Sequence, residues 1–593
     1  MFVVAIPVEG MLNNTIKNEI INMKDLYFQE FVPGEFVVKF KNDTEIPNPK
    51  IEEYNDKYKV YSFKKIFSNS ENTILDKIYV LKVPKNSNIL SIVKDYESLS
   101  EVVYAEPNYI LCLGLEPRSL PISLPTSIYD LRSYLNRNDP YFNKQWALEN
   151  TGQRGGTPDA DIDALEAWGI ETGSTDTVIA IIDTGVDYNH PDLADNIWIN
   201  ENEIPINGID DDGNGFVDDV RGWDFVDNDN VPIDDFGHGT HCAGIAAAVG
   251  NNSIGIAGVC GNCKIMPIKT LNFFGQAIFL NIALSIRYAA DNGANVISMS
   301  FGGRRSSKII KNAIEYAYDK DAVLTAAAGN SNTFSHYYPA AYDSVIAVAG
   351  TNNKDRWLNI GNFFNKAGSN YGPWVDVAAP GGEIYSTMPT YLVTMNFGGY
   401  KKNYDYLSGT SMSAPHVAGL AALILSKNPY LSNEEVKSII CTNVDPYYSI
   451  YYLGTGRINA FKALNEHIHL PEIPDTPLGP RQGKIGEIYT YTTKTTDPNR
   501  DQLYYMWDWG EEKSNWIGPF DSGEQIYTKH TWTESGNYKI KVKAKNMGGA
   551  ESLWSKKLTV TIPRNKEIEN LFFFRLIERF QILKKVLNHL INI

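Results

Sequence analysis

The stretch GTSMSAPHVAG, at residues 409–419, places a small serine, Ser411, in a glycine-rich approach to an apolar run. The run continues as SAPHVAGLAALIL and predicts a buried helix. A serine at a loop-to-helix junction can present its hydroxyl outward, while nearby backbone N–H groups point at the group that it attacks. Because serine alone is a poor nucleophile, this interpretation requires a histidine and an orienting carboxylate elsewhere in the chain.

Both partners have candidates upstream. The run VIAIID (178–183) is rich in β-branched residues and ends at Asp183, as expected of a buried parallel strand that delivers a carboxylate at its C-terminal edge. His238 lies in DDFGHGTHCAGIAAA (234–248), between two glycines and just before an alanine-rich helix. Singly, a capping serine, a core histidine and a strand-end aspartate are the simpler interpretations. Together, in the order Asp, His, Ser, they predict a catalytic triad.

The segments DTG (183–185), HGTHCAG (238–244) and GTSMSAPH (409–416) resemble the three signature blocks of the subtilisin-like serine protease (subtilase) family. A fourth segment, VLTAAAGNSN (323–332), resembles the family segment whose Asn side chain lines the oxyanion hole. The resemblance implies that Ser411 is the nucleophile, His238 the general base, Asp183 the carboxylate that orients the imidazole, and Asn330, with the Ser411 backbone N–H, the oxyanion donor.

The catalytic domain is expected at 138–467, with an α/β fold and a doubly wound, mostly parallel sheet. Apolar runs such as KIMPIKTL (264–271) alternate there with helical stretches such as FLNIALSIRYAADNG (279–293). In such a sheet the site lies at the carboxyl ends of the strands.

Composition limits the other functions. A chain of 593 residues is too long for one core, so three or four units are expected. The formal net charge is −16 and the catalytic region has no Lys/Arg block, which disfavours nucleic-acid binding. No run of eighteen uncharged apolar residues predicts a spanning helix. The segment 1–29 is a leader of uncertain role, without the basic start of a signal peptide.

Residues 30–112 are expected to form a propeptide. Strands are predicted at 31–41, 77–84 and 102–111, and a helix at 87–100. The "EFVVKF" and "VVYAEPNY" segments resemble the subtilase propeptide, an intramolecular chaperone and inhibitor whose tail lies in the active site until it is cut; an unrelated α+β domain is the alternative. The proline-containing stretch 113–137 is expected to be a cleavable linker.

Two segments are expected to form the walls of the substrate cleft. By the resemblance, Ser300, Phe301 and Gly302 supply an extended strand that pairs with the substrate backbone. Gly275 begins the opposing strand, and Phe279 lies over a second pocket.

The pocket walls predict substrate preference. Ala327 belongs to a small apolar wall at 326–328, and neither wall carries an acidic residue. We therefore expect apolar or aromatic residues before the scissile bond, because burying a charge without a partner costs several kcal/mol. Gln276 and Ala277 replace the glycine-rich residues usual in the family, which alters the subsite away from the scissile bond.

Calcium is the cofactor that the resemblance implies. The segment NNSIGIAG (251–258) resembles the family's high-affinity calcium loop, with Asn252 as a ligand joined by Asp192 and Asp139. Oxygen ligands of this kind suit calcium and not zinc.

A second acidic segment, IDDDGNGFVDD (209–219), places Asp210, Asp212 and Asn214 at alternate positions, like the start of a calcium loop. Arg221 stands where the closing glutamate would fall. The segment therefore predicts either a second calcium site or a solvated acidic loop.

Five cysteines predict no dense disulfide framework. Cys242 resembles the buried free thiol beside the catalytic histidine of proteinase-K-like subtilases. Cys260 and Cys263 form a lone CxxC, which is either a local disulfide or two free thiols.

The C-terminal part changes character after a proline-rich linker at 468–483. Short alternating runs at 484–562 predict an all-β sandwich that resembles a PKD-type immunoglobulin-like domain, with Trp507 and Trp509 as core and edge residues. Residues 563–593 predict an amphipathic helix that docks on the sandwich, on a partner or on an anionic surface.

Two functional classes follow. The first is a secreted or cell-surface, calcium-stabilised serine endopeptidase, made as a self-processing zymogen, with protein or peptide substrates and its own propeptide as inhibitor. The second is a cell-surface binding protein with a vestigial protease domain. The complete triad favours the first.

Overall fold

The computed structural model describes residues 29–67, 73–113, 138–361, 367–447, 449–465, 470–498, 500–546, 550–563, 579–581 and 584–585. It contains two compact units, Met1–Glu466 and His467–Ile593. None of the helices in these ranges is long and apolar enough to cross a membrane. Nearly all of the expected leader, all of the expected linker at 113–137 except Leu113, and most of the expected C-terminal helix at 563–593 lie outside the described residues.

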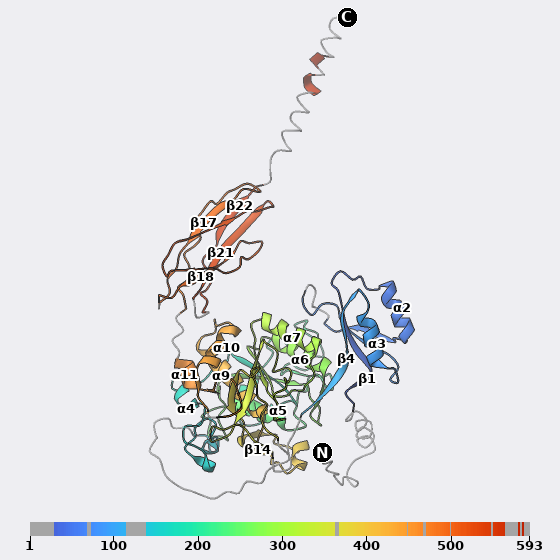
Figure 1. Ribbon diagram of the computed structural model, residues 1–593, viewed down its shortest axis with the longest axis vertical. Helices are drawn as coiled ribbons and strands as arrows, with labels where there is room; N and C mark the ends of the chain where they lie inside the picture. The colour runs from blue at the N-terminus through green and yellow to red at the C-terminus, as the bar shows by residue number, and fades with distance from the viewer. Residues whose placement is uncertain are drawn as a thin grey trace. The chain divides into compact units, whose positions relative to one another are not determined.

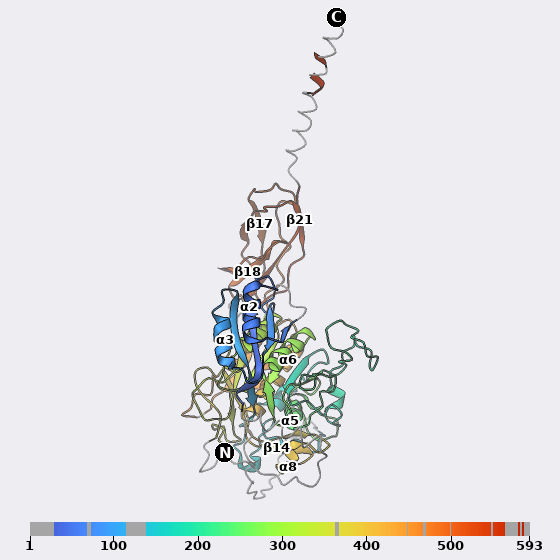
Figure 2. The same cartoon turned by 90° about the vertical axis from the view of Figure 1, so that its right-hand side faces the viewer.

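The propeptide region forms an antiparallel sheet covered by two helices (Figure 1). Its elements are β1 (Phe31–Phe40), α2 (Pro49–Tyr58), β2 (Ser62–Lys65), β3 (Ile78–Lys82), α3 (Ile89–Glu97) and β4 (Val102–Cys112). Figure 2 shows α2 and α3 lying together beside the strands. Helix α3 buries Ile89, Ile92 and Tyr96 in one core with Phe36 and other sheet residues.

A nine-stranded sheet forms the centre of the catalytic region, in the order β15-β16-β12-β11-β10-β9-β5-β7-β6. All neighbours are parallel except β15 and β16. The strands are β5 (Val178–Asp183), β6 (Trp223–Asp224), β7 (Lys264–Lys269), β9 (Val296–Met299), β10 (Val323–Ala327), β11 (Val345–Thr351), β12 (Val377–Pro380), β15 (Val444–Asp445) and β16 (Arg457–Ile458). The expected α/β class with a mostly parallel sheet is confirmed.

Helices cover both faces of this sheet, because side chains alternate along its strands. Val178, Ala180 and Ile182 share a core with α6 (Phe279–Asp291) and α7 (Lys308–Asp319), which pack on each other. The intervening residues of β5 face the opposite side, where α5 (His238–Ala247) and α9 (Thr410–Lys427) pack together.

The remaining elements of this unit lie outside the central sheet and its four main covering helices. They are three 3-10 turns (Phe142–Lys144, Gln153–Gly155, Ala194–Asn196), α4 (Ala164–Ala167), β8 (Gln276–Ile278), α8 (Thr394–Phe397), α10 (Asn433–Thr442), α11 (Ala460–Asn465) and the hairpin of β13 (Ile384–Met388) and β14 (Asn403–Leu407).

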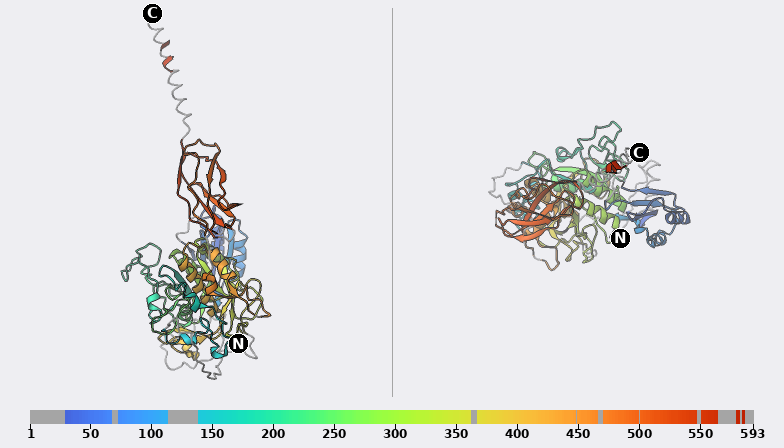
Figure 3. Two further views of the ribbon diagram at one scale, coloured as in Figure 1. Left: turned by 90° about the vertical axis from the view of Figure 1, so that its left-hand side faces the viewer. Right: turned by 90° about the horizontal axis from the view of Figure 1, so that it is seen from above.

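The second unit is all-β, with its strands in orange and red in Figure 3. Strand β17 (Tyr489–Thr493) pairs with β20 (Ile526–His530), and a second sheet has the order β19-β18-β21-β22. Its strands are β18 (Leu503–Asp508), β19 (Ile517–Phe520), β21 (Gly536–Asn546) and β22 (Leu558–Ile562). Trp507 and Trp509 are both buried in the core between the sheets, so Trp509 is not an edge residue.

Candidate active site

Asp183 and His238 lie side by side because the end of a strand meets the start of a helix. Strand β5 ends at Asp183, and α5 begins at His238. A Cβ on Gly239 would lie 2.1 Å from the Gly185 carbonyl oxygen, so glycine allows the helix to approach the strand this closely. The His238 Nδ1 and Asp183 Oδ1 atoms are 2.8 Å apart, and both side chains are buried. The Thr184 N–H also donates to Asp183 Oδ1.

The charge of Asp183 governs the titration of His238. Burial of the imidazole lowers its pKa. Attraction by the Asp183 carboxylate, together with Cys242, raises the pKa by more than burial lowers it. The net pKa of His238 therefore lies above that of an ordinary histidine.

Ser411 lies in the same cleft as His238, in the first turn of α9. Its hydroxyl donates to the Ser300 carbonyl at 2.9 Å and not to the imidazole, while the Ser300 hydroxyl donates to the Ser411 carbonyl at 2.8 Å. The first N–H groups of a helix have no intrahelical acceptor, so the Ser411 N–H is available to a ligand.

Asn330 follows β10 and lines this cleft. Its side-chain oxygen accepts hydrogen bonds from the Thr410 N–H at 2.9 Å and the Thr410 hydroxyl at 3.0 Å. This pair of donors fixes the amide orientation and leaves the NH₂ group available to the cleft.

The residues expected to bind substrate also come together. Ser300, Phe301, Gly302 and Ala327 line the cleft, although Phe301 is almost wholly buried. Phe279 is not among the residues that line this cleft; it is buried at the start of α6, with its ring centroid 5.5 Å from that of Tyr109 in β4.

The end of β4 runs antiparallel to β8, in the register Ile110↔Ile278, Leu111↔Ala277 and Cys112↔Gln276. The next N–H, that of Leu113, donates to the Gly275 carbonyl at 2.7 Å. Cys112 and Leu113 line the cleft together with His238 and Ser411. An extended segment of the chain therefore enters the cleft as an added strand.

The sequence did not predict how the propeptide region holds two helix starts. Glu106 accepts hydrogen bonds from the Lys308 and Ile309 N–H groups and the Ser307 hydroxyl, at the N-terminus of α7. Asn108 Oδ1 accepts from the Leu280 N–H in the first turn of α6. These contacts satisfy N–H groups that have no partner within the helix.

Two cleft residues, Arg304 and Tyr337, and one residue near its edge, Phe236, were missed. Leu113 and Phe236 both flank Gly275, because a Cβ there would lie 3.2 Å from the Leu113 side chain and 3.3 Å from the Phe236 ring. Arg304 and Tyr337 line the cleft beside Ser331, the residue after Asn330. Tyr337 stands in an irregular loop segment, NTFSHYYPA (332–340), whose sequence has no period that predicts a cleft residue.

The residues expected at the first calcium site lie together. Asp139 accepts hydrogen bonds from the Asn251 and Asn252 N–H groups, and the Asn252 side chain donates to Asp192 at 2.9 Å. Asp192 also accepts from the Ile256 N–H and the Tyr404 hydroxyl. Both carboxylates are buried, at 4% and 0% exposure, and neither forms an ion pair with a described Lys, Arg or His. Two buried carboxylates without a counter-cation fit a calcium ion.

The second acidic segment gathers a different set. Carboxylate oxygens of Glu203, Asp212 and Asp219 lie within 4.8 Å of one another. The Asn214 side chain donates to both Asp212 and Asp219. Asp210 is not part of this group of three, and its oxygens accept from the N–H groups of Asn214 and Gly215. Glu203 and Asp219 supply carboxylates that the spacing of the segment did not predict.

The structure shows the state of the three cysteines on which the sequence analysis commented. Cys260 and Cys263 form a disulfide, which settles the alternatives that the sequence left open. Cys242 is free and buried, with its Sγ 3.8 Å from His238 Nδ1. Burial raises the pKa of the Cys242 thiol, which keeps it protonated and disfavours it as a nucleophile.

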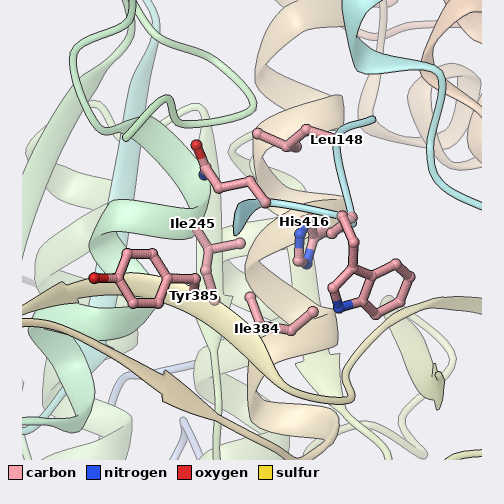
Figure 4. Close-up of a pocket in the computed structure, with 8 residues that line it drawn as sticks. Leu148, Ile245, Ile384, Tyr385 and His416 are labelled. Atoms are coloured by element: carbon pink, nitrogen blue, oxygen red, sulfur yellow. The ribbon is translucent and has the colours of Figure 1, made fainter. Parts of the chain in front are cut away.

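His416, in the same motif as Ser411, has a structural role. Its Nδ1 lies 2.8 Å from the Met412 carbonyl, one turn back in α9. Figure 4 shows it pointing into a small cavity surrounded by Leu148, Ile245 and Ile384. Burial lowers the pKa of His416 to about 4, so the imidazole is neutral.

A serine hydroxyl, a buried histidine–aspartate pair and an amide donor around one cleft are the groups of a serine hydrolase. Comparisons with known proteins make the class specific. Residues 174–481 match the Peptidase S8 (subtilase) family, residues 22–108 the fervidolysin N-terminal prodomain, and residues 486–559 the PKD domain.

The chain belongs to the subtilase family. It is 35% identical over 439 residues to the thermophilic serine proteinase of Bacillus sp. strain AK1, covering 73% of this chain and 88% of that one. It is 42% identical over 329 residues to thermitase of Thermoactinomyces vulgaris, covering 55% and 98%. A solved protease of Pseudoalteromonas arctica is 32% identical, with 56% and 99% covered and a TM-score of 0.45. The protein is thus a subtilisin-like serine endopeptidase with a prodomain and a PKD domain.

Proposed function

We propose that this endopeptidase is a calcium-stabilised zymogen that cuts its own propeptide, with Asp183, His238 and Ser411 as its triad and Asn330 as oxyanion donor. The observation that carries the proposal is the tail at 110–113. It pairs with β8, donates to the Gly275 carbonyl and ends beside His238 and Ser411, as a substrate strand would.

The proposed chemistry is acyl transfer. When a peptide carbonyl enters, the Ser411 hydroxyl leaves the Ser300 carbonyl, gives its proton to His238 and attacks the carbonyl carbon. The resulting oxyanion accepts hydrogen bonds from the Ser411 N–H and the Asn330 NH₂ group. His238 then protonates the leaving amine, while Asp183 stabilises the imidazolium, and water releases the acyl group by the same steps.

Apolar side chains are the proposed choice two and four residues before the cut. Leu113 and Phe236 flank the same glycine, Gly275, and Leu111 is 6% exposed and belongs to the main core cluster. A charged side chain in place of Leu111 would lose its hydration without gaining a partner.

Self-processing is the first expected result. Wild-type chain should yield a propeptide that ends within a few residues after Leu113, whereas Ser411→Ala should stay full length. Ser413→Ala is the matched control, because the buried Ser413 hydroxyl has no hydrogen-bond partner among the described residues. Intact-mass spectrometry and N-terminal sequencing of each purified chain measure the outcome.

Two results would contradict this proposal. One is cleavage of purified Ser411→Ala at the same bond in the absence of another protease. The other is a wild-type cut well before Leu113, which would remove the tail from the position of a substrate.

We also propose that Asp139, Asp192 and Asn252 hold calcium, and that Glu203, Asp212, Asp219, Asp210 and Asn214 form a second site. The ion would neutralise carboxylates that otherwise repel one another. It would bind the folded state and stabilise it in proportion to its affinity, by about 2.7 kcal/mol at a hundredfold excess over Kd.

Removal of calcium should therefore lower the melting temperature. In full-length Ser411→Ala, which avoids autolysis, a chelator should reduce Tm by on the order of 5 °C or more. Adding Asp192→Asn should reduce this calcium response by more than half, whereas Asp176→Asn, at an exposed position, should leave it unchanged. Equal Tm values with and without chelator would show that calcium does not stabilise the fold.

The proposed location is outside the cytoplasm. The Cys260–Cys263 disulfide is typical of an oxidising compartment. The proposed partners are protein or peptide substrates and the propeptide itself, whose Glu106 and Asn108 cap α7 and α6. The alternative of a binding protein with a vestigial protease domain is disfavoured because His238, Asn330 and Ser411 line one cleft and Asp183 lies 2.8 Å from His238 Nδ1. The surface or partner contact predicted for the helix at 563–593 stays a prediction, because most of these residues lie outside the described ranges.

A further inference from the structure

The ring of Tyr337 stands between the two walls of the main pocket. A Cβ on Gly329 would lie 2.7 Å from Tyr337 Cδ1, and a Cβ on Gly302 would lie 4.0 Å from the same atom. The Tyr337 hydroxyl donates to the Ser331 hydroxyl at 2.7 Å, and Arg304 Nε donates to the Tyr337 hydroxyl at 3.4 Å. The ring is therefore in contact with the wall at Gly329 and close to the wall at Gly302, and hydrogen bonds hold its hydroxyl group in place.

This position has a steric consequence. The pocket between Ser300–Gly302 and Ala327–Asn330 is where the side chain before the scissile bond would enter, next to Ser411. A large side chain there meets the Tyr337 ring, and moving the ring aside would break its hydrogen bond to Ser331. Overfilling a packed site costs far more than the extra contacts return.

The chain's own tail is consistent with such a restriction. The tail that pairs with β8 carries two large apolar side chains, Leu111 and Leu113, and the next residue in the sequence is Gly114. The two leucines thus precede the smallest side chain available.

We infer that Tyr337 is a specificity-determining residue that limits the side chain immediately before the cut to Gly, Ala or Ser. This inference rests on the proposed function and narrows the substrate specificity of the endopeptidase. The preference for aromatic residues at that position, expected from the sequence, is replaced by a preference for small ones, while the apolar preference two and four residues before the cut remains.

Fluorogenic peptides that copy the sequence of the tail test this inference. The series Ile-Leu-Ser-Leu-Xaa, with Ser in place of Cys112 and a coumarin leaving group, is assayed with mature wild type for Xaa equal to Ala or Phe. We expect kcat/KM for Ala to exceed that for Phe by about tenfold or more. Tyr337→Ala should lower this Ala-to-Phe ratio by about tenfold or more, because the vacated space accepts the phenyl ring.

Tyr337→Phe is the matched control. It keeps the ring and loses only the hydrogen bond to Ser331, so its Ala-to-Phe ratio should stay close to that of wild type. The inference is overturned if wild type cleaves the Phe peptide as well as the Ala peptide, or if Tyr337→Phe changes the ratio as much as Tyr337→Ala.

Casein hydrolysis separates this inference from the proposed function. Wild type that degrades casein but does not discriminate between the peptides contradicts the role of Tyr337 alone. Wild type that cleaves neither casein nor any peptide, like Ser411→Ala, contradicts the proposed function and the inference with it.

Discussion

Replacing His238 by alanine is expected to lower kcat for peptide hydrolysis by about a millionfold, the size of loss known for the equivalent change in subtilisin itself. His238 is the only described base whose ring bonds a buried carboxylate within the cleft of Ser411. Without it, the Ser411 hydroxyl has no acceptor for its proton during attack, and the leaving amine has no proton donor. Single-turnover and steady-state assays of the mature variant, released by added wild type and then purified, measure the loss.

The double variant Asp183→Asn/His238→Ala is the control. Since the triad acts as a unit, it should be no less active than His238→Ala alone. The double variant should also unfold at a higher temperature than the single variant His238→Ala. In His238→Ala the buried Asp183 carboxylate has lost its imidazole partner, whereas the double variant has no charge at this position. Losses that multiply, or a His238→Ala variant with substantial activity, would contradict the assigned roles.

Asp183→Asn should cost about ten-thousandfold in kcat, because an amide at this position favours the wrong tautomer of His238. It should also change the pH dependence. In wild type the pKa of His238 is raised by the Asp183 charge, and the protonated imidazole is inactive as a base. Activity should therefore rise with pH through a value above that of an ordinary histidine, about 6.5.

Removing the Asp183 charge lowers the pKa of His238, so the acidic limb of the Asp183→Asn profile should move to lower pH. The profile of kcat/KM against pH, compared between the two enzymes, measures the direction. A limb that stays in place or moves to higher pH would show that Asp183 does not hold the charge of His238.

Local sequence predicted the α/β class, and the residues that it predicted for the centre of the site lie close together. Asp183 ends an unbroken apolar strand, and His238 and Ser411 each begin a helix after glycine, so each lies where a short motif can show it. Three propeptide strands were predicted from their apolar runs, whereas β2, a four-residue strand without a fully buried side chain, was missed. Helix α2 was missed, although Asn48 caps it and Pro49 begins it, because only Ile51 is fully buried and the rest of its core-facing side is two partly buried tyrosines, Tyr54 and Tyr58.

The remainder depends on contacts between distant segments. Tyr337 reaches Ser331 and Gly329 from a loop with no period, so no motif predicts that it enters the cleft. Glu203 joins Asp212 and Asp219 only when a long loop folds back on itself. The sequence predicted either a second calcium site or a solvated acidic loop there, and its spacing alone could not show which carboxylates lie close together.

Activation of Ser411 by His238 is the step on which the proposed mechanism depends. A fluorophosphonate phosphonylates a serine only when a neighbouring base makes it nucleophilic, so peptide mapping by mass spectrometry after treatment tests this step directly. We expect one label per mature chain, on Ser411, and none in His238→Ala. A label on another residue such as Ser413, or equal labelling of Ser411 in His238→Ala, would contradict the mechanism.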